Sequence, residues 1–263
     1  MSNEKYVFFD IDGTIYDYVN GVSPSAKEAV RLLRENGHHP VLCTGRTRIM
    51  IFDEIMDMGF DGIIAGGGTY IEWDGKLLKA EELPRKEVIR LVKTLSENGF
   101  STYPEGINEL YYDRNYVENG EDAIYVIYKK HIPDHIKPID LESEMHVSKV
   151  SATYTAKSNR DAVLAELGDD YDWADHNGVM LETIPKNASK GTGVRQLIEY
   201  LGADMEDTYA FGDSFNDLDM LQTVKYGVAM GNSKESLKKL VPIHTEALLD
   251  GGVYKALKRF GLI

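Results

Sequence analysis

The sequence has a single cysteine and no long apolar run, and both shortages exclude classes of protein. Cys43 has no second cysteine with which to form an intrachain disulfide, which is typical of a reducing compartment. It stands in the apolar run Pro40–Cys43, so we expect a buried, unreactive thiol. No apolar run approaches membrane-spanning length, and we expect no signal peptide. These features predict a cytoplasmic protein without a membrane partner.

Positive charge is also in short supply. The 263 residues include 29 Lys and Arg against 43 Asp and Glu, for a formal net charge of −14. Nucleic-acid backbones and anionic membrane surfaces attract basic patches, so we expect neither as a partner. Hydrophobic residues make up 43% of the chain, which is enough for a sizeable core in one large domain or two smaller ones. An anionic substrate would need positive charge supplied locally.

Two aspartates follow the first apolar run of the chain. Tyr6–Phe9 leads directly into Asp10-Ile11-Asp12-Gly13-Thr14. A short apolar run before a turn signal predicts a buried strand, and residues i and i+2 of a strand point to the same side. Asp10 and Asp12 are therefore expected to leave the strand together, at the edge where α/β sheets bind ligands. Because two carboxylates repel, the pair requires a cation, a shared proton or a hydrogen-bond network.

Two other interpretations of this stretch compete with a functional pair. Asp and Gly are turn residues, so the stretch after Phe9 can be an ordinary turn with solvated acids. A calcium loop of the EF-hand type needs Gly at its sixth position and Glu at its twelfth. Counted from Asp10, those positions are Ile15 and Gly21, which excludes the calcium loop.

Strands and helices alternate after this first strand. Ser23-Pro24 predicts the start of a helix that ends at Asn36-Gly37, and Pro40–Cys43 predicts a second buried strand. Together they form a βαβ unit with a right-handed crossover. We then expect a helix over 47–58, a strand over 62–65 and a hairpin around residues 74–75.

Three glycines, Gly66–Gly68, follow the third of these strands. They do not match the dinucleotide pattern Gly-x-Gly-x-x-Gly, and no suitable helix follows them. A dinucleotide site is therefore not favoured.

The pattern of predicted elements changes between residues 83 and 185. An amphipathic helix is followed by an aromatic-rich stretch in which short strands alternate with helices, and Asn177-Gly178 predicts a hairpin turn. The predicted strands cover 100–103, 109–113, 147–155, 171–174 and 179–184. We interpret this region as a separate α+β module inserted into the first domain.

The α/β pattern resumes after the module. Ser189 and Lys190 open a helix that runs to Tyr200, and Thr208–Phe211 predicts a buried strand that runs into Gly212–Asp217. A further strand is expected over Tyr226–Met230. Four polar clusters therefore lie at strand ends or at a helix start, namely Asp10/Asp12, Thr44-Gly45, Lys190 and Asp213/Asn216/Asp217. Each has a plain alternative, since Thr44 can cap a helix, Lys190 can be a solvated surface lysine and Gly212-Asp213 can be a turn.

In this order, the four clusters resemble the motifs of the haloacid dehalogenase (HAD) superfamily. The matching segments are Asp10–Thr14, Thr44–Arg46, Ser189–Gly191 and Gly212–Met220. More narrowly, the chain resembles the Cof-type phosphatases, which carry a large C2 (IIB) cap between the second and third motifs. The resemblance covers essentially the whole chain. It implies an α/β fold with a Rossmann-like parallel-sheet core, from residues 1–82 and 186–263, and an inserted α+β cap domain over 83–185.

One segment departs from the family pattern. Gly66–Gly68 stands where these proteins commonly have Asn-Gly after the third strand. The departure bears on any hinge or substrate contact of that asparagine, and not on the chemistry.

The resemblance also implies roles for single residues. Asp10 would be the nucleophile that forms an aspartyl-phosphate, and Asp12 the general acid and then the general base. Mg²⁺ would be held by Asp10, the backbone carbonyl of Asp12 and Asp213. Asp217 would orient Lys190 or a metal-bound water, and Arg46 would either reach the substrate or brace its loop. The phosphoryl oxygens would be held by the Ile11 N–H, Thr44, Gly45, Lys190, which would also serve in catalysis, and Asn216.

The implied activity is that of a Mg²⁺-dependent phosphatase acting on small phosphate monoesters. Sugar phosphates are favoured, and pyridoxal phosphate or flavin mononucleotide are alternatives within the family. Two rivals stay open: a phosphotransferase that passes the phosphoryl group to a second small molecule, and a non-catalytic binder of phosphorylated ligands. A pure binder has no need of an acid–base residue beside the nucleophile. The protein is expected to be a monomer or a small homo-oligomer.

Overall fold

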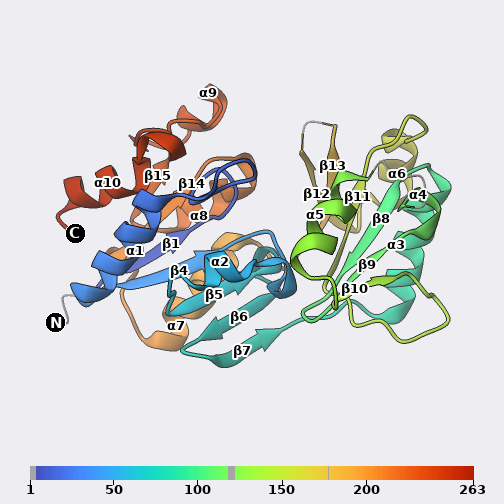
Figure 1. Cartoon of the computed structure of the whole chain (residues 1–263), viewed down its shortest axis with the longest axis horizontal. Coiled ribbons are helices and arrows are strands. Elements are labelled where there is room, and N and C mark those ends of the chain that lie inside the picture. The colour runs from blue at the N-terminus through green and yellow to red at the C-terminus, as the bar shows by residue number, and fades with distance from the viewer. Residues whose placement is uncertain (1–3, 118–121, 177) are drawn as a thin grey trace. The chain divides into compact units, whose positions relative to one another are not determined.

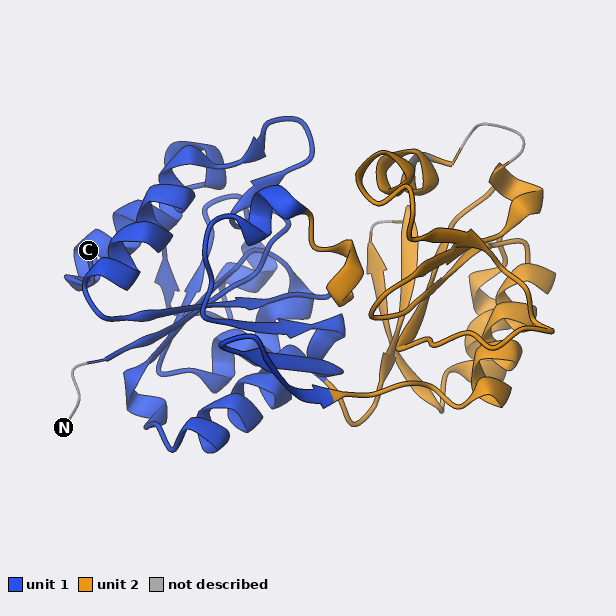
Figure 2. Cartoon of the chain, turned by 60° about the horizontal axis from the view of Figure 1, so that its bottom comes forward, with its two compact units in different colours: residues 1–45, 53–79, 189–263 blue, residues 46–52, 80–188 orange. Residues whose placement is uncertain are grey.

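The structure is a computed structural model that describes residues 4–117, 122–176 and 178–263. The chain forms two compact units, coloured blue and orange in Figure 2. Unit 1 comprises residues 1–45, 53–79 and 189–263, and unit 2 comprises residues 46–52 and 80–188. The expected inserted domain, 83–185, differs from unit 2 by a few residues at each end and lacks the segment 46–52.

Unit 1 is built on an eight-stranded sheet with the order β16-β15-β14-β1-β4-β5-β6-β7 (Figure 1). The strands from β16 to β5 pair in parallel, and β6 runs antiparallel to β5. This confirms the predicted α/β fold with a largely parallel sheet. The strands are β1 (Tyr6–Phe9), β4 (His39–Cys43), β5 (Gly62–Ala65), β6 (Tyr70–Trp73), β7 (Lys76–Ala80), β14 (Thr208–Gly212), β15 (Tyr226–Ala229) and β16 (Ile243–His244). A separate small hairpin is formed by β2 (Tyr16–Asp17) and β3 (Gly21–Val22).

Helices cover both faces of this sheet. The main ones are α1 (Pro24–Glu35), α7 (Lys190–Leu201), α8 (Leu218–Thr223) and α10 (Gly252–Phe260), and the shorter ones are α2 (Asp53–Met56) and α9 (Glu235–Lys238). Phe8 and Val41 pack with residues of α7 and α8 in one fully buried cluster. Their strand neighbours Phe9 and Leu42 point to the opposite face, where α1 packs against α10 (Figure 1). The sheet is therefore buried on both faces, as the continuous apolar strands predicted.

The helix predicted over 47–58 is wrong. Residues Arg48–Met50 form the 3₁₀ turn η1, and Ile51 is extended. Within the predicted range, α2 is the part that forms an α-helix. The break has a packing cause within unit 2, because the ring of Phe52 stacks on His131 with centroids 3.9 Å apart. Periodicity alone does not reveal such a contact.

Unit 2 has a six-stranded sheet with the order β10-β9-β8-β11-β13-β12. Its strands are β8 (Ser101–Glu105), β9 (Leu110–Tyr112), β10 (Ile136–Pro138), β11 (Lys149–Thr153), β12 (Tyr171–His176) and β13 (Met180–Pro185). Its helices are α3 (Arg85–Glu97), α4 (Arg114–Val117), α5 (Ala123–His131) and α6 (Arg160–Leu167). The sequence analysis missed β10 and α5, and Asn177 of the expected hairpin turn lies outside the described residues.

The two faces of the unit 2 sheet differ in polarity. One face packs residues such as Val150 and Leu181 against α3 and α6 in an apolar cluster. On the other face lie three buried charged residues, Glu105, Lys149 and Glu182. In the part of the chain that the structure describes, no helix is long and apolar enough to cross a membrane.

The buried charges of unit 2 form a chain of ion pairs. Lys149 Nζ lies 2.7 Å from Glu182 Oε1 and 3.5 Å from Glu105 Oε2, and His176 Nε2 lies 2.8 Å from Glu182 Oε2. Ser151 Oγ donates to Glu105. Burial raises the pKa of Glu105 to about 7, against the pull of Lys149. Burial acts on Glu182 as well, but Lys149 and His176 outweigh it and hold the pKa of Glu182 below its usual range.

These opposite shifts predict opposite effects of pH on stability. Between the ordinary glutamate pKa of 4.5 and about 7, the folded protein keeps a proton on Glu105 that the unfolded chain has lost. Glu105 therefore makes the free energy of unfolding fall as the pH rises through this window. Glu182 contributes stability that is present above its unfolded pKa and is lost as the pH falls toward its depressed folded pKa.

We therefore expect Glu105→Gln and Glu182→Gln to differ in their pH dependence. Relative to wild type, the free energy of unfolding of Glu105→Gln should rise by about 1–2 kcal/mol between pH 5 and pH 8, because glutamine need not ionise. Glu182→Gln should be less stable than wild type at pH 5, since it leaves Lys149 with one carboxylate fewer, and this deficit should shrink only as the pH falls below 4.5. Urea unfolding at several pH values measures both variants, and a deficit of Glu182→Gln that does not shrink in acid would contradict the assignment.

Candidate active site

The site residues named from the sequence follow strands that are neighbours in the unit 1 sheet. Phe9 at the end of β1 pairs with Leu42 of β4 and with Phe211 of β14. Asp10 follows β1, Thr44 follows β4 and Asp213 follows β14. Because these strands are parallel, the three residues leave the sheet at the same carboxyl edge, where α/β sheets bind ligands.

Lys190 is the central cation of the site. Its Nζ lies 2.6 Å from Asp10 Oδ1 and 2.5 Å from Asp217 Oδ1. Lys190 is 3% exposed, Asp10 5% and Asp217 0%, so water screens these ion pairs very little. The structure thus brings together three residues that lie far apart in the sequence.

Burial and crowding shift the pKa values of the site. Burial raises the pKa of Asp10 well above its usual range, and the charge of Asp217 adds to the rise while Lys190 opposes it. Burial and Asp217 likewise raise the pKa of Asp213 to about 7. Burial alone would lower the pKa of Lys190, but Asp10 and Asp217 outweigh it and raise it. The cluster therefore has more negative charge than one lysine can balance.

The carboxylate of Asp217 is fully engaged. Its Oδ1 accepts from Lys190, and its Oδ2 accepts from the backbone N–H groups of Asp213 and Ser214, each at 3.0 Å. Gly212 makes room for this arrangement, because a Cβ there would lie 2.5 Å from Asp217 Cβ. Asp217 therefore fixes both Lys190 and the backbone that carries Asp213.

The donor set of the site fits a hard divalent cation. One carboxylate oxygen from each of Asp10, Asp213 and Asp217 lies within 4.8 Å of the others. Carboxylate oxygens suit Mg²⁺, which is bound through one or two carboxylates and retains several waters. Since both Asp217 oxygens already accept from N–H groups, Asp10 and Asp213 are the pair best placed to hold the ion.

The first turn of α7 fixes the position of Lys190. The Ser189 side chain accepts from Thr192 N at 3.0 Å while Thr192 Oγ1 accepts from Ser189 N at 2.8 Å, which forms a capping box. The carboxylate of Asp219 also accepts from Ser189 Oγ. Gly68 packs against this turn at φ +98°, and a Cβ there would lie 2.3 Å from Ser189 O. Gly68 thus has a structural reason that is unrelated to dinucleotide binding.

Asp12 and Ile11 lie in a tight loop directly after β1. The carbonyl of Ile11 accepts from the N–H groups of Thr14, Ile15 and Tyr16, at 3.0 to 3.2 Å. Ile11 is buried and Asp12 is half-buried. Asp12 lies close enough to Asp10 for its charge to add to the rise in the pKa of Asp10.

Thr44 and Asn216, two further predicted residues, lie after β4 and on a 3₁₀ turn. Thr44 is 1% exposed, and its backbone bonds to Ile64 O and Gly67 N fix the start of the loop that contains Gly45. Asn216 lies on the 3₁₀ turn η4 (Phe215–Asp217), where its Oδ1 accepts from Ser214 Oγ at 2.6 Å.

Arg46 belongs to unit 2. Its Cζ lies 4.5 Å from the ring centroid of Phe52, and its Nη1 donates to Met50 O at 3.1 Å. These contacts hold the guanidinium against its own segment, 46–52. The two roles expected for Arg46, reaching the substrate or bracing its loop, stay predictions.

The sequence analysis missed Asn232. Its Nδ2 donates to Gly13 O at 2.9 Å and to Asp213 Oδ2 at 3.3 Å, and its Oδ1 accepts from Leu248 N at 3.0 Å. Asn232 follows β15, which lies next to β14 in the sheet. The same rule that found Asp10 and Asp213 would have found it, because it too is a polar residue just beyond a parallel strand.

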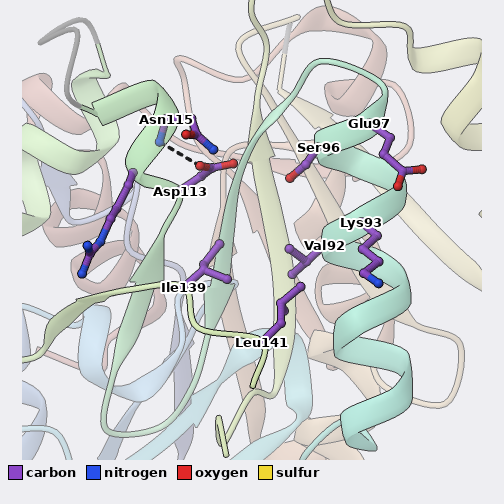
Figure 3. A pocket seen from close by; sticks show the side chains of 9 residues that line it. Val92, Lys93, Ser96, Glu97, Asp113, Asn115, Ile139 and Leu141 are labelled. Atoms are coloured by element: carbon purple, nitrogen blue, oxygen red, sulfur yellow. Dashed lines mark hydrogen bonds between the residues drawn. The ribbon is translucent and has the colours of Figure 1, made fainter. Parts of the chain in front are cut away.

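A hollow of about 480 Å³ lies elsewhere, within unit 2 (Figure 3). Val92, Ile139 and Leu141 line its apolar part, and Ser96 and Asp113 lie near its polar end (Figure 3). Of its nine described lining residues, only Val92 is buried. A ligand site usually brings a few polar groups together in a concave pocket. The carboxylate cluster of unit 1 brings such polar groups together, whereas the side chains that line the hollow are mostly half-buried or exposed.

Comparisons with known proteins identify the family of the chain. Residues 7–257 match the family described as haloacid dehalogenase-like hydrolase. The Bacillus subtilis (strain 168) protein named "Putative phosphatase YkrA" is 27% identical over 264 residues, or 99% of each chain. Pyridoxal phosphate phosphatase YbhA of Escherichia coli (strain K12) is 26% identical over 254 residues, which are 89% of this chain and 90% of that one.

Solved structures share the fold of the whole chain. A protein of Geobacillus kaustophilus HTA426 has a TM-score of 0.81 at 28% identity and covers 99% of this chain and 100% of its own. The HAD subclass IIB sugar phosphatase BT4131 has a TM-score of 0.84 at 24% identity and covers 98% of this chain and 100% of its own. The likeness to BT4131 is a likeness of fold.

Replacing Lys190 should expose the charge imbalance of the site. We expect Lys190→Met to lower the free energy of unfolding of metal-free protein by about 3–5 kcal/mol, because it leaves buried carboxylates without their cation. Added Mg²⁺ should restore part of this loss. Urea unfolding in EDTA and in Mg²⁺ measures both effects.

Lys76→Met is the matched control for this experiment. Lys76 is exposed and donates to Tyr200 OH at 3.1 Å, so its loss should change stability by no more than about 0.5 kcal/mol. Equal stabilities of Lys190→Met and wild type in EDTA would show that the lysine does not balance the cluster.

Proposed function

The chain belongs to the haloacid dehalogenase-like hydrolase family and is a phosphatase of the Cof type, and from that premise we propose that it hydrolyses small phosphate monoesters with Mg²⁺. One observation carries the proposal. A buried lysine, Lys190, lies between Asp10 and Asp217 at the strand edge from which Asp213 also projects. Such a cluster can offer a carboxylate nucleophile, a cation for phosphoryl oxygens and ligands for a divalent ion.

In the first half-reaction, a carboxylate oxygen of Asp10 attacks phosphorus. The bond between Asp10 and phosphorus forms as the bond from phosphorus to the ester oxygen breaks. Asp12 gives its proton to the leaving oxygen, which departs as an alcohol. The product on the protein is an aspartyl-phosphate.

In the second half-reaction, Asp12 acts as the base. It takes a proton from a water molecule, whose oxygen attacks phosphorus, and the bond between Asp10 and phosphorus breaks. Inorganic phosphate leaves, and Asp10 is again a carboxylate while Asp12 is again protonated. The loop closed by the Ile11 carbonyl keeps Asp12 beside Asp10 through both steps.

Asp10, Asp213 and the backbone carbonyl of Asp12 would hold the Mg²⁺ ion. When bound, Mg²⁺ supplies positive charge that offsets the repulsion between the carboxylates and an anionic phosphoryl group. Asp217 keeps Asp213 in place through two backbone N–H groups.

Cationic and N–H groups of the chain would bind the phosphoryl oxygens. Lys190 supplies a buried ammonium, which the net charge of −14 makes necessary. The Ile11 N–H, Thr44, Gly45 and Asn216 complete the proposed set.

We assign the choice of substrate to unit 2, as a cap that closes over the site and contacts the leaving group. Sugar phosphates are the favoured class, and the pyridoxal phosphate named for the Escherichia coli relative is the second candidate. The rival activity is transfer of the phosphoryl group to a second small molecule, in which an alcohol replaces water in the second half-reaction. The protein is proposed to act in the cytoplasm as a monomer or small homo-oligomer.

The proposal is tested by a screen of phosphate monoesters with and without Mg²⁺. We expect release of inorganic phosphate without any acceptor sugar, with sugar phosphates giving the highest kcat/KM. EDTA should abolish turnover and Mg²⁺ should restore it, because the carboxylate cluster repels an anionic ester. Full turnover in metal-free protein would refute the metal assignment, and phosphate release only with an acceptor would favour the phosphotransferase.

The covalent step can be tested by the stereochemistry at phosphorus. Each in-line displacement inverts phosphorus, so attack by Asp10 followed by attack by water should release phosphate with retained configuration from an ester made chiral with oxygen isotopes. Inversion would mean that water attacks the ester directly. NMR of the released phosphate measures the configuration.

Asp10→Asn and Asp12→Asn provide the matched pair for this experiment. Asp10→Asn should give no covalent intermediate, because an amide is a poor nucleophile. Asp12→Asn should keep the nucleophile and lose about 10²–10⁴-fold in rate. Its loss should be smallest for esters with a good leaving group, which need no proton to depart.

A further inference from the structure

Asn232 contacts three segments that meet beside the carboxylate cluster. Its Nδ2 bridges Gly13 O, at 2.9 Å, and Asp213 Oδ2, at 3.3 Å, while its Oδ1 accepts from Leu248 N at 3.0 Å. A side-chain amide has two N–H donors and one carbonyl oxygen, so these contacts match what the group can make. The loop after β1 and the carboxylate after β14 are thus held by one side chain.

We propose that Asn232 is a positioning residue for the metal site, which orients the Asp213 carboxylate for Mg²⁺. This inference rests on the proposed function, because it concerns the ion that Asp10 and Asp213 would hold. Asn232 is not itself a ligand in the proposal. It acts through the hydrogen bond to Asp213 Oδ2.

Two contacts restrict the rotation of the Asp213 carboxylate. Asn232 Nδ2 donates to Oδ2, and Gly13 lies close to the same oxygen. A Cβ on Gly13 would lie 2.3 Å from Asp213 Oδ2, so any larger residue there would displace the carboxylate. With Oδ2 held, the position of the other carboxylate oxygen is set as well.

The anchor behind Asn232 is itself firmly held. Gly231 N donates to Glu246 O at 3.0 Å, and Gly252 N donates to Ala247 O at 3.0 Å. A Cβ on Gly231 would lie 2.4 Å from Ala247 N, so the two segments are in close contact. The N–H of Leu248 therefore offers a fixed point against which the amide can orient Asp213.

The neutrality of the amide is the chemical reason for an asparagine here. A lysine or arginine at this position would pair with Asp213 and compete with a divalent cation for its oxygens. An amide donates a hydrogen bond and leaves the negative charge in place. Partners that orient metal ligands in this way typically change metal affinity by about 10–100-fold when they are removed.

The test compares Mg²⁺ binding by wild type and Asn232→Ala, using the full chain stripped with EDTA. We expect the Kd for Mg²⁺, measured by calorimetry, to rise by about tenfold or more in Asn232→Ala. A role limited to joining loops would lower the melting temperature and leave the Kd unchanged. Asn232→Ser, which keeps one short donor, serves if the alanine variant does not fold, and its Kd should shift in the same direction.

Asn36→Ala is the matched control. Asn36 Nδ2 donates to Leu262 O at 2.9 Å and so also ties two distant segments of unit 1 together, but it contacts no carboxylate of the cluster in the described chain. Its Kd for Mg²⁺ should match that of wild type.

The outcomes separate this inference from the proposed function. If wild type binds Mg²⁺ and Asn232→Ala binds it within about twofold of the wild-type Kd, the positioning role is wrong and the metal site stands. If wild type shows no saturable Mg²⁺ binding, the metal assignment fails and this inference fails with it. A tenfold weaker Kd in both Asn232→Ala and Asn36→Ala would also overturn it, because the effect would then be general.

Discussion

The buried ion pairs of Lys190 are the interaction on which the rest of unit 1 depends. One ammonium lies between Asp10 and Asp217, and Asp213 adds a further carboxylate within 4.8 Å of both. Charges this deeply buried are tolerated only when they are paired and hydrogen-bonded. The capping box fixes where α7 begins, and the parallel strands end side by side. Both features place the charged side chains where they can pair. The excess negative charge that remains is what makes a divalent cation chemically reasonable here.

In each unit a buried lysine pairs with two carboxylates, but the two lysines lie in different surroundings. In unit 1, Lys190 stands at a helix start and its partners lie just beyond strand ends. In unit 2, Lys149 and its partners Glu105 and Glu182 are all strand residues on one face of the sheet. Well-packed apolar residues would often be as stable as such buried charges, so stability alone does not explain them. The pKa of Glu105 is raised and that of Glu182 is lowered, so one lysine stabilises the two carboxylates to different extents.

The parts of the fold and site that could be predicted from sequence are those governed by local rules. Apolar runs gave the strands β1, β4 and β14, and the strand-end rule placed Asp10 and Asp213 at one edge. The helix over 47–58 failed because the packing of Phe52 within unit 2 overrides a local pattern. Strand β10 and helix α5 lie in unit 2, where short elements carry weak periodic signals. Asn232 was missed because its partners, Gly13 and Leu248, are distant in sequence.

Lys190 and Asn232 contact the carboxylate cluster with groups of different charge. In the proposed reaction an anionic phosphoryl group must be brought into a chain whose formal net charge is −14, and a full positive charge lies beside Asp10, the proposed nucleophile. On the other side of the cluster, the group that touches Asp213 is a neutral amide. A second cation there would reduce the repulsion equally well but would occupy the oxygens that a metal needs. Under the proposed function, positive charge is therefore supplied where the substrate would bind and withheld where the cation would enter, so neither residue could take the place of the other.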